Sequence, residues 1–292
     1  MNERWRAHMN REPLRPITED EVRSFRDDGI VCLRGLFGSD WIAHLRDAAE
    51  RGLAEPGDLH VEVAAARGQR GRFFHDTFVW RRDPACRRFV FGSPAAEIAA
   101  TLMAAARINI FFDQWLIKEP GTPTPTPWHH DLTYWPVDGD QICTLWLALD
   151  AVDAESGAVE YVKGSHRWGR RYRAATFSGI AQYKEPLPEV PDIDALRDGL
   201  EIASFALEPG DCTVHHGLLV HGAPGNRSPD RRRRAHVSRW AGDDAVFHPR
   251  PDIQEMPPLP DLAPGSPITS DLWPQVWPRG GRPMPSRNPS RR

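Results

Sequence analysis

The segment from Trp128 to Trp135 (WHHDLTYW), paired with His221 far downstream, most restricts how this chain can fold. Two histidines and one carboxylate are the ligand set of a 2-His-1-carboxylate iron site, which leaves one face of the metal open. If residues 129–131 form an extended strand, His129 and Asp131 point to the same side and His130 points away. His221 must then come from another strand, so the fold has to bring distant strands together.

Three histidines compete for the remote ligand position: His215, His216 and His221. His221 follows an apolar run and precedes a tight Gly/Pro/Asn turn, and a ligand at the end of a strand leaves room for a substrate. We expect His215 and His216 to be structural, one in the core and one on the surface. An isolated His-x-Asp triplet is weak evidence, but the aromatic residues around this one favour a dry, shaped pocket.

Four consecutive arginines occupy positions 231–234. We expect most of this run to be a solvated basic turn. On a strand, one face carries the odd-numbered residues Arg233, Ala235, Val237 and Arg239. This small and apolar face is predicted to point into the barrel. Arg233 could then hold a carboxylate by two parallel hydrogen bonds, which a lysine cannot reproduce.

The formal net charge of -3 over 292 residues argues against general nucleic-acid or membrane-surface binding. No apolar run approaches the ~20 residues that a membrane span needs, and the first residues lack the apolar core of a secretory signal. The four cysteines are widely spaced, with no Cys-x-x-Cys pair. Reduced thiols in a cytoplasmic protein are the simplest interpretation. The oligomeric state stays open.

Helices are predicted in the first third of the chain. The capping-box pattern of Thr18 and Glu21 predicts a helix over about 19–28, and a short strand at 30–33 follows. Ser39 or Asp40 is expected to cap a second helix. Ser93-Pro94 is expected to open a third helix that ends near residue 105. Residues 54–92 show no regular pattern.

Strands are predicted in the remainder. Runs of β-type sequence, punctuated by turn signals, occupy 108–118, 141–149, 158–162, 202–207, 211–220 and 234–240. Helices followed by many short strands predict a β-rich jelly roll, or double-stranded β-helix, with supporting N-terminal helices. We expect a flexible leader (1–17), one jelly-roll domain (18–250) with a lid insertion (165–200), and a proline-rich tail (251–292). Much of the tail is expected to wrap the surface, with disorder from about residue 279.

Several stretches, in order, resemble the phytanoyl-CoA hydroxylase-like family of iron(II)/2-oxoglutarate dioxygenases over about residues 18–250. The resemblance implies Fe(II), 2-oxoglutarate and O2 as cofactor and cosubstrates, and a small-molecule substrate. The matching stretches are Gln114–Gly121 (QWLIKEPG), Trp128–Trp135, Thr144–Asp150 (TLWLALD), Ser156–His166 (SGAVEYVKGSH), Pro209–Asp211 and His221–Trp240.

Carried over to this sequence, the resemblance assigns His129, Asp131 and His221 as the iron ligands. It assigns Arg233 to the far carboxylate of 2-oxoglutarate. Further cosubstrate contacts match Gln114, Trp146 and, by a looser alignment, Phe74.

The chain departs from the family pattern in two places. His130 stands where the family usually has glutamine in the middle of the His-x-Asp triplet. The turn after His221 is one residue longer than usual. Counting from His221 therefore favours Arg232 as the anchor, whereas counting back from Ala235, together with strand parity, favours Arg233.

Hydroxylation of an aliphatic C–H bond of a lipid or natural-product intermediate, with release of succinate and CO2, is the default expectation. Desaturation and ring formation are alternatives. Halogenation is disfavoured because related halogenases replace the carboxylate ligand, here Asp131, by a small residue. A cupin-like metalloenzyme that does not use 2-oxoglutarate would not need Arg233 or Gln114, and a non-catalytic jelly-roll binding protein would not need a complete ligand set. The expected pocket walls are Phe74, His75, Tyr134 and Trp135.

Overall fold

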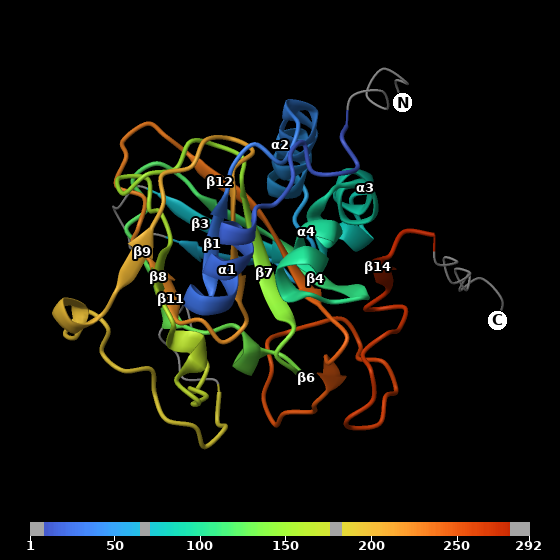
Figure 1. Ribbon diagram of the computed structural model, residues 1–292. Coiled ribbons are helices and arrows are strands. Elements are labelled where there is room, and N and C mark those ends of the chain that lie inside the picture. The colour runs from blue at the N-terminus through green and yellow to red at the C-terminus, as the bar shows by residue number, and fades with distance from the viewer. Residues whose placement is uncertain (1–8, 65–70, 176–182, 281–292) are drawn as a thin grey trace.

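The computed structural model describes residues 9–64, 71–175 and 183–280 (Figure 1). Within these ranges the chain forms a jelly roll whose two main sheets enclose a pocket. The larger sheet has the order β1-β10-β7-β12-β4-β3-β2, with β14 added beside β4. The smaller sheet has the order β5-β11-β8-β9, and β13 pairs with β6 apart from both.

Every strand pair in the described chain is antiparallel. The larger sheet contains β1 (Ile30–Leu33), β2 (Val61–Ala64), β3 (Arg72–Thr77), β4 (Ile108–Lys118), β7 (Ile142–Ala148), β10 (Cys212–His216), β12 (Arg233–Ala241) and β14 (Gln275–Trp277). The others are β5 (Thr126–His129), β6 (Val137–Asp138), β8 (Glu160–Val162), β9 (Ile202–Ser204), β11 (His221–Ala223) and β13 (Val246–Phe247).

The helices are short and precede the long strands. They are α1 (Glu19–Asp28), α2 (Ser39–Ala54), α3 (Pro84–Gly92) and α4 (Ala95–Met103), with 3₁₀ turns η2 (Val79–Arg81), η3 (Leu132–Tyr134), η4 (Ser165–Arg167) and η5 (Arg197–Gly199). None of the helices in the described ranges is long and apolar enough to cross a membrane.

Helix α1 begins and ends where its sequence predicts. The side chain of Thr18 accepts a hydrogen bond from the backbone N–H of Glu21, and the carboxylate of Glu21 accepts one from the backbone N–H of Thr18. Gly29 ends the helix with φ +76°, a left-handed conformation that glycine adopts without steric cost. Helix α2 differs in its start, because Gly38 is the N-cap and makes no side-chain bond there.

The region 54–92 is more ordered than its sequence indicated. It contains β2, β3 and helix α3, whose first N–H groups are capped by the carboxylate of Asp83. Pro84 at the first helical position is a start signal that the sequence analysis did not use. The third predicted helix, expected to run to about residue 105, ends earlier, because Ala104 has φ +50°.

Alternation along the central strands divides their side chains between two layers. On β7, Leu145 and Leu147 pack into the main hydrophobic cluster with the helices, whereas Trp146 packs with Val237 of β12 in a cluster between the sheets. Figure 1 shows the helices on the side of the larger sheet away from β8, β9 and β11. The inner faces of β4, β7 and β12 therefore remain available for a pocket.

The proline-rich tail contributes to the core as well as to the surface. Strand β14 extends the larger sheet beside β4, and Leu272 and Trp273 are buried in a cluster with Phe111 and Trp135. The expectation of a surface wrap misses these buried side chains. Residues 281–292, where disorder is predicted, lie outside the described residues.

Candidate metal centre

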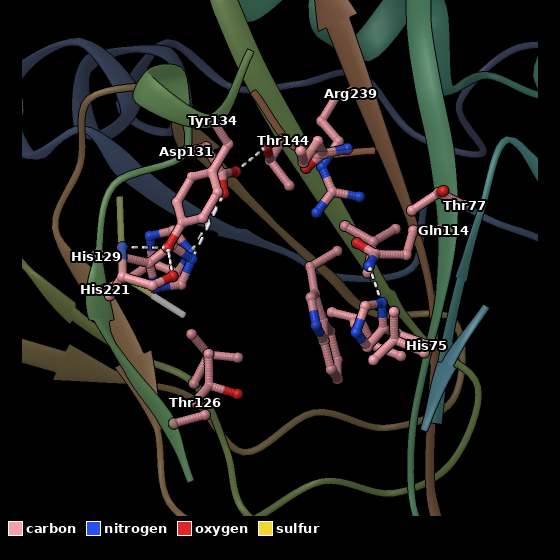
Figure 2. Close-up of a pocket in the computed structure, with 18 of the residues that line it drawn as sticks. His75, Thr77, Gln114, Thr126, His129, Asp131, Tyr134, Thr144, His221 and Arg239 are labelled. Carbon is pink, nitrogen blue, oxygen red and sulfur yellow. Dashed lines mark hydrogen bonds and ion pairs between the residues drawn. The ribbon is translucent and has the colours of Figure 1, made fainter. Parts of the chain in front are cut away.

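Three side chains, His129, Asp131 and His221, converge at one end of the space between the sheets (Figure 2); we call them the candidate triad. One ligand atom from each lies within 4.8 Å of the other two. Nε2 of His129 is 3.6 Å and Nε2 of His221 is 3.9 Å from Oδ1 of Asp131. All three side chains are buried, so the cluster is shielded from bulk water.

The two histidines are held by pairing between strands. His221 opens β11 and lies directly opposite His129, the last residue of β5. Side chains opposite one another on antiparallel strands lie on the same face of the sheet, and the ring centroids are 4.2 Å apart. The predicted strand 211–220 is thus wrong in part: β10 ends at His216, and His221 begins a strand of the other sheet rather than ending an apolar one.

Asp131 reaches the histidines by a different route from the one predicted. Strand β5 ends at His129, and Asp131 has helical backbone angles (φ -70°, ψ -39°) at the start of η3. Strand alternation over residues 129–131 therefore does not explain the convergence. The chain turns back at the end of the strand, and this turn brings the carboxylate beside the imidazoles.

Backbone carbonyl groups fix the orientation of both imidazoles. Nδ1 of His129 lies 2.8 Å from the carbonyl oxygen of Pro127, and Nδ1 of His221 lies 2.9 Å from that of Leu219. A carbonyl only accepts hydrogen bonds, so each Nδ1 carries a proton, and a ring held in this way can offer the lone pair of Nε2 to a metal. Histidines that bind metals typically have this arrangement. The donor set therefore fits a divalent transition metal.

The carboxylate of Asp131 is held by neighbours on the larger sheet. The hydroxyl of Thr144 donates a hydrogen bond of 2.6 Å to Oδ2, and Nε2 of His215 is 3.4 Å from the same oxygen. Burial raises the pKa of Asp131, but the nearby rings of His129 and His215 outweigh it, so the pKa lies well below its ordinary value. Burial also lowers the pKa of His221 well below its ordinary value. An ionised carboxylate and neutral imidazole are the forms that bind metal.

The neighbouring histidines have other contacts. The ring of His130 points away from the candidate triad, and its Nε2 accepts a hydrogen bond from the N–H of Tyr172. One of His215 and His216 was expected in the core and the other on the surface, yet both are buried. Nε2 of His216 lies 3.2 Å from Asp140. His215 instead contacts the carboxylate of Asp131, a supporting position that the sequence analysis missed.

A cavity of about 320 Å³ adjoins the candidate triad. Arg233 of β12 lies in its wall and is only 1% exposed. Nη1 of Arg233 donates to the carbonyl oxygen of Gly157 at 2.7 Å, and its guanidinium carbon is 5.4 Å from the ring centre of Trp146. In the described chain no carboxylate lies within 4.0 Å of this guanidinium. Burial lowers the pKa of Arg233 to about 10, so it stays charged at neutral pH.

The other three arginines of the cluster have carboxylate partners outside the cavity. Arg231 pairs with Asp153 and Glu155, Arg232 with Glu50 and Glu119, and Arg234 with Glu50 and Asp150. Strand parity was therefore the better guide to the side chain that enters the barrel, and it selects Arg233 over Arg232.

Two more predicted cosubstrate residues also line the cavity. Trp146 of β7 packs under Arg233, and Gln114 of β4 lies in the same wall, on the other side of β12 from Trp146. Nε2 of Gln114 is 3.2 Å from Nδ1 of His75 (Figure 2). Burial lowers the pKa of His75 to about 4, so this ring is neutral.

Phe74 is not at the cavity, and its predicted contact with the cosubstrate is wrong. Alternation along β3 turns Phe73, His75 and Thr77 to the cavity. Phe74 points to the opposite face and is buried in the cluster under the helices. His75, expected only as a pocket wall, occupies the inward position instead.

The outer wall of the cavity comes from the 3₁₀ turn η3 and from segments outside the helices and strands. The predicted walls Tyr134 and Trp135 are present, and Ala175 and Tyr183 of the 165–200 insertion join them. The hydroxyl of Tyr134 hydrogen-bonds with the backbone of Ala175. Gln254 of the tail accepts a hydrogen bond of 3.3 Å from the indole of Trp135. No local pattern in the sequence indicates this contribution of the tail.

The sequence matches a known family. The family model for phytanoyl-CoA dioxygenase (PhyH) matches residues 25–235. The chain belongs to this family. Phytanoyl-CoA dioxygenase 1 of Oryza sativa subsp. japonica is 27% identical over 232 residues, which cover 73% of this chain and 78% of the relative. The resemblance drawn from the motifs is confirmed.

Solved structures confirm the jelly-roll fold. The non-heme alpha ketoglutarate dependent carbocyclase SnoK from nogalamycin biosynthesis is 25% identical with a TM-score of 0.72, and the match covers 91% of this chain and 99% of that chain. The epimerase SnoN, solved with Fe3+, alpha ketoglutarate and nogalamycin RO, is 23% identical with a TM-score of 0.70, covering 88% and 98%.

Proposed function

We propose that this protein is an iron(II)/2-oxoglutarate-dependent dioxygenase that hydroxylates an aliphatic C–H bond of a small molecule and releases succinate and CO2. The observation that carries the proposal is one cavity with two complementary features. The candidate triad lies at one end, where Nε2 of both histidines faces the carboxylate of Asp131. Arg233 lies in the wall and is a buried cation without a carboxylate partner in the described chain. Membership in the phytanoyl-CoA dioxygenase family supports it.

His129, Asp131 and His221 would hold the iron. Their donor set leaves coordination positions open for other ligands. Bound iron and 2-oxoglutarate supply the activation of O2, and the protein contributes binding, orientation and exclusion of water. The carbonyls of Pro127 and Leu219 keep the rings in position, because they bond to the Nδ1 atoms.

Arg233 would hold the far carboxylate of 2-oxoglutarate. A buried guanidinium is costly without an anion, and a carboxylate satisfies it with charge-assisted hydrogen bonds. Trp146 and Gly157 fix the guanidinium from the protein side. Gln114 is placed to contact the cosubstrate from the neighbouring strand β4.

The small-molecule substrate would bind between the candidate triad and the outer wall. That wall includes Tyr134 and Trp135, and the rings of Tyr134 and Tyr183 are 5.2 Å apart. Tyr183 belongs to the 165–200 insertion, so contacts of this kind support a lid role for the insertion. An aromatic wall at this place would help to exclude water from the reacting C–H bond.

Ring formation is a second candidate outcome. The likeness to a carbocyclase over almost the whole of both chains favours it. A cupin-like enzyme that does not use 2-oxoglutarate has no use for the buried cation at Arg233, and a non-catalytic binding protein has no use for a complete triad. Both are disfavoured on these grounds.

A substrate screen that follows succinate release tests the proposal. The purified protein is supplied with iron(II), 2-oxoglutarate and O2, and candidate lipids, amino acids and natural-product intermediates are added one at a time. We expect succinate to rise with particular compounds, and to stay at background in His221→Ala or without 2-oxoglutarate. Turnover that persists without 2-oxoglutarate would contradict the proposal.

A further inference from the structure

A second buried arginine, Arg239, lies in the wall of the same cavity. It shares the inward face of β12 with Arg233 and is 7% exposed. It pairs across the sheet with Thr144 of β7 and Phe112 of β4. Figure 2 shows its guanidinium directed into the cavity between Thr144 and Gln114. Arg239 therefore lies beside Thr144, the residue whose hydroxyl donates a hydrogen bond to Asp131.

The guanidinium of Arg239 has apolar neighbours and no anion. Its carbon is 4.5 Å from the ring centre of Phe112 and 5.9 Å from that of Trp135. Nε and Nη1 are buried without a hydrogen-bond partner among the described residues. No carboxylate of the described chain lies within 4.0 Å of it. Burial lowers its pKa to about 10, so it remains a cation at neutral pH.

The nearest acidic side chains are already occupied. Asp131 accepts from Thr144 and contacts the histidines. Asp113 lies 3.0 Å from His236 and accepts from the N–H of Trp80. A buried cation without a partner costs several kcal/mol by order of magnitude. A structure that keeps such a group directed into a cavity is suited to a ligand that brings the missing negative charge.

The position of Arg239 separates it from the proposed anchor of the cosubstrate. Arg239 lies six positions along the strand from Arg233, which corresponds to about 20 Å between Cα atoms at ~3.3 Å per residue. Arg239 also packs on Trp135, whose indole bonds to Gln254 in the outer wall. Its surroundings are therefore those of the substrate side of the cavity.

We propose that Arg239 binds a carboxylate of the organic substrate, so that the substrate is an acid with an apolar or aromatic skeleton. The inference rests on the proposed function, because it takes the candidate triad as the reaction centre. The guanidinium forms no hydrogen bond within the described chain, and the edge that Nε forms with Nη2 suits a carboxylate, which offers two oxygens. The aromatic wall formed by Tyr134 and Trp135 suits the skeleton.

Binding of paired probes tests the inference. The protein is loaded with iron(II) and 2-oxoglutarate without O2. Affinities are measured by calorimetry for benzoate, cyclohexanecarboxylate and 2-naphthoate, each against its primary amide. We expect the acid of at least one pair to bind about 10-fold more tightly than its amide, since a charge-assisted pair in a buried site is worth this much or more. Arg239→Gln should remove the preference, and Arg239→Lys should keep only part of it.

The affinity for 2-oxoglutarate is measured in the same samples, with Arg233→Gln for comparison. We expect Arg239→Gln to leave it within about threefold, whereas Arg233→Gln weakens it strongly. Two results would overturn the inference: no acid-over-amide preference in any pair, or a loss of 2-oxoglutarate affinity in Arg239→Gln as large as that in Arg233→Gln. The latter would assign the anion to the cosubstrate. Failure of the proposed function is distinguishable, because wild-type protein would then not bind 2-oxoglutarate.

Discussion

Thr144 donates a hydrogen bond of 2.6 Å to Oδ2 of Asp131, although the two residues belong to different layers of the jelly roll. Thr144 lies on β7 of the larger sheet, and Asp131 follows β5 of the smaller one. The bond occupies one carboxylate oxygen and leaves Oδ1 directed towards Nε2 of His129 and His221. It therefore determines which oxygen is available to a metal.

Removal of this hydrogen bond should weaken metal binding. Thr144→Val keeps the shape of the side chain but deletes the donor. Loss of such a supporting bond typically costs about 10–100-fold in metal affinity or activity. Thr144→Ser retains the hydroxyl and is the matched control. Titration of the metal-free protein with iron(II) without O2 measures the effect; equal affinities for the valine and serine variants would contradict it.

The histidines should differ sharply in their effect on iron. His221→Ala removes a proposed ligand, so we expect iron affinity to fall by more than about 100-fold. His130→Ala and His216→Ala should retain iron, because those rings bond to Tyr172 and Asp140 instead. Metal content after equilibrium dialysis measures this. Near-normal iron content in His221→Ala would remove His221 from the ligand set.

The identity of the candidate triad followed from residue types, but its geometry did not. A pattern of alternation assumes that a strand continues, and β5 ends two residues before Asp131. Nothing in the local sequence marks that end, because it depends on how η3 packs against the rest of the chain. The three side chains still lie together, because His-x-Asp also brings its side chains to one place across this turn.

Strand parity could be applied to β12, whereas Phe74 was assigned by a loose alignment alone. Strand β12 is regular from Arg233 to Arg239, with its register shift only after Arg239, so alternation assigns its faces correctly. Phe74 lies in a region whose strands were not recognised, and its face was therefore not determined. Contributions of the tail, such as Gln254 and Trp273, depend on long-range contacts that no local pattern records.

Arg233 and Arg232 should separate cleanly in their effect on 2-oxoglutarate. Arg233→Ala would leave a bound carboxylate buried without its partner, which costs about 2–5 kcal/mol of binding free energy. Arg232→Ala removes partly exposed ion pairs with Glu50 and Glu119 at the surface. They are worth about 1 kcal/mol and affect stability rather than the cavity. The concentration of 2-oxoglutarate that half-saturates each variant measures the difference. The reverse order would assign the anchor to Arg232.

Lys118 should make the stability of the protein depend on pH. It is fully buried, its Nζ donates to the carbonyl of Pro224 at 2.8 Å, and burial, with Arg233 nearby, lowers its pKa to about 6 from 10.5. Between pH 6 and 10.5 the amino group of Lys118 keeps its proton in the unfolded chain but loses it in the folded protein. The free energy of unfolding therefore rises with pH over this range. Relative to wild type, Lys118→Met should be most stabilised near pH 6, and this advantage should fall by roughly 1 kcal/mol per pH unit as pH rises.

Urea unfolding of the metal-free wild type and Lys118→Met at pH 6.5, 7.5 and 8.5 measures this advantage. Lys184→Met, at an exposed position, is the matched control. The lost hydrogen bond to Pro224 affects every pH alike and cancels from the trend. A difference between wild type and Lys118→Met that is constant over this range would show that burial does not lower the pKa of Lys118.

Asp131 should keep the reaction an oxygenation even in chloride-rich buffer. Because the carboxylate would occupy a metal position, the open positions should serve 2-oxoglutarate and O2 rather than halide. A substrate found in the screen is incubated with ¹⁸O2 and excess chloride, and the product is examined by mass spectrometry. We expect one labelled oxygen atom. A product that gains chlorine would contradict the role given to Asp131, whereas one that only loses two hydrogens would retain the iron site and assign the reaction to desaturation or ring formation.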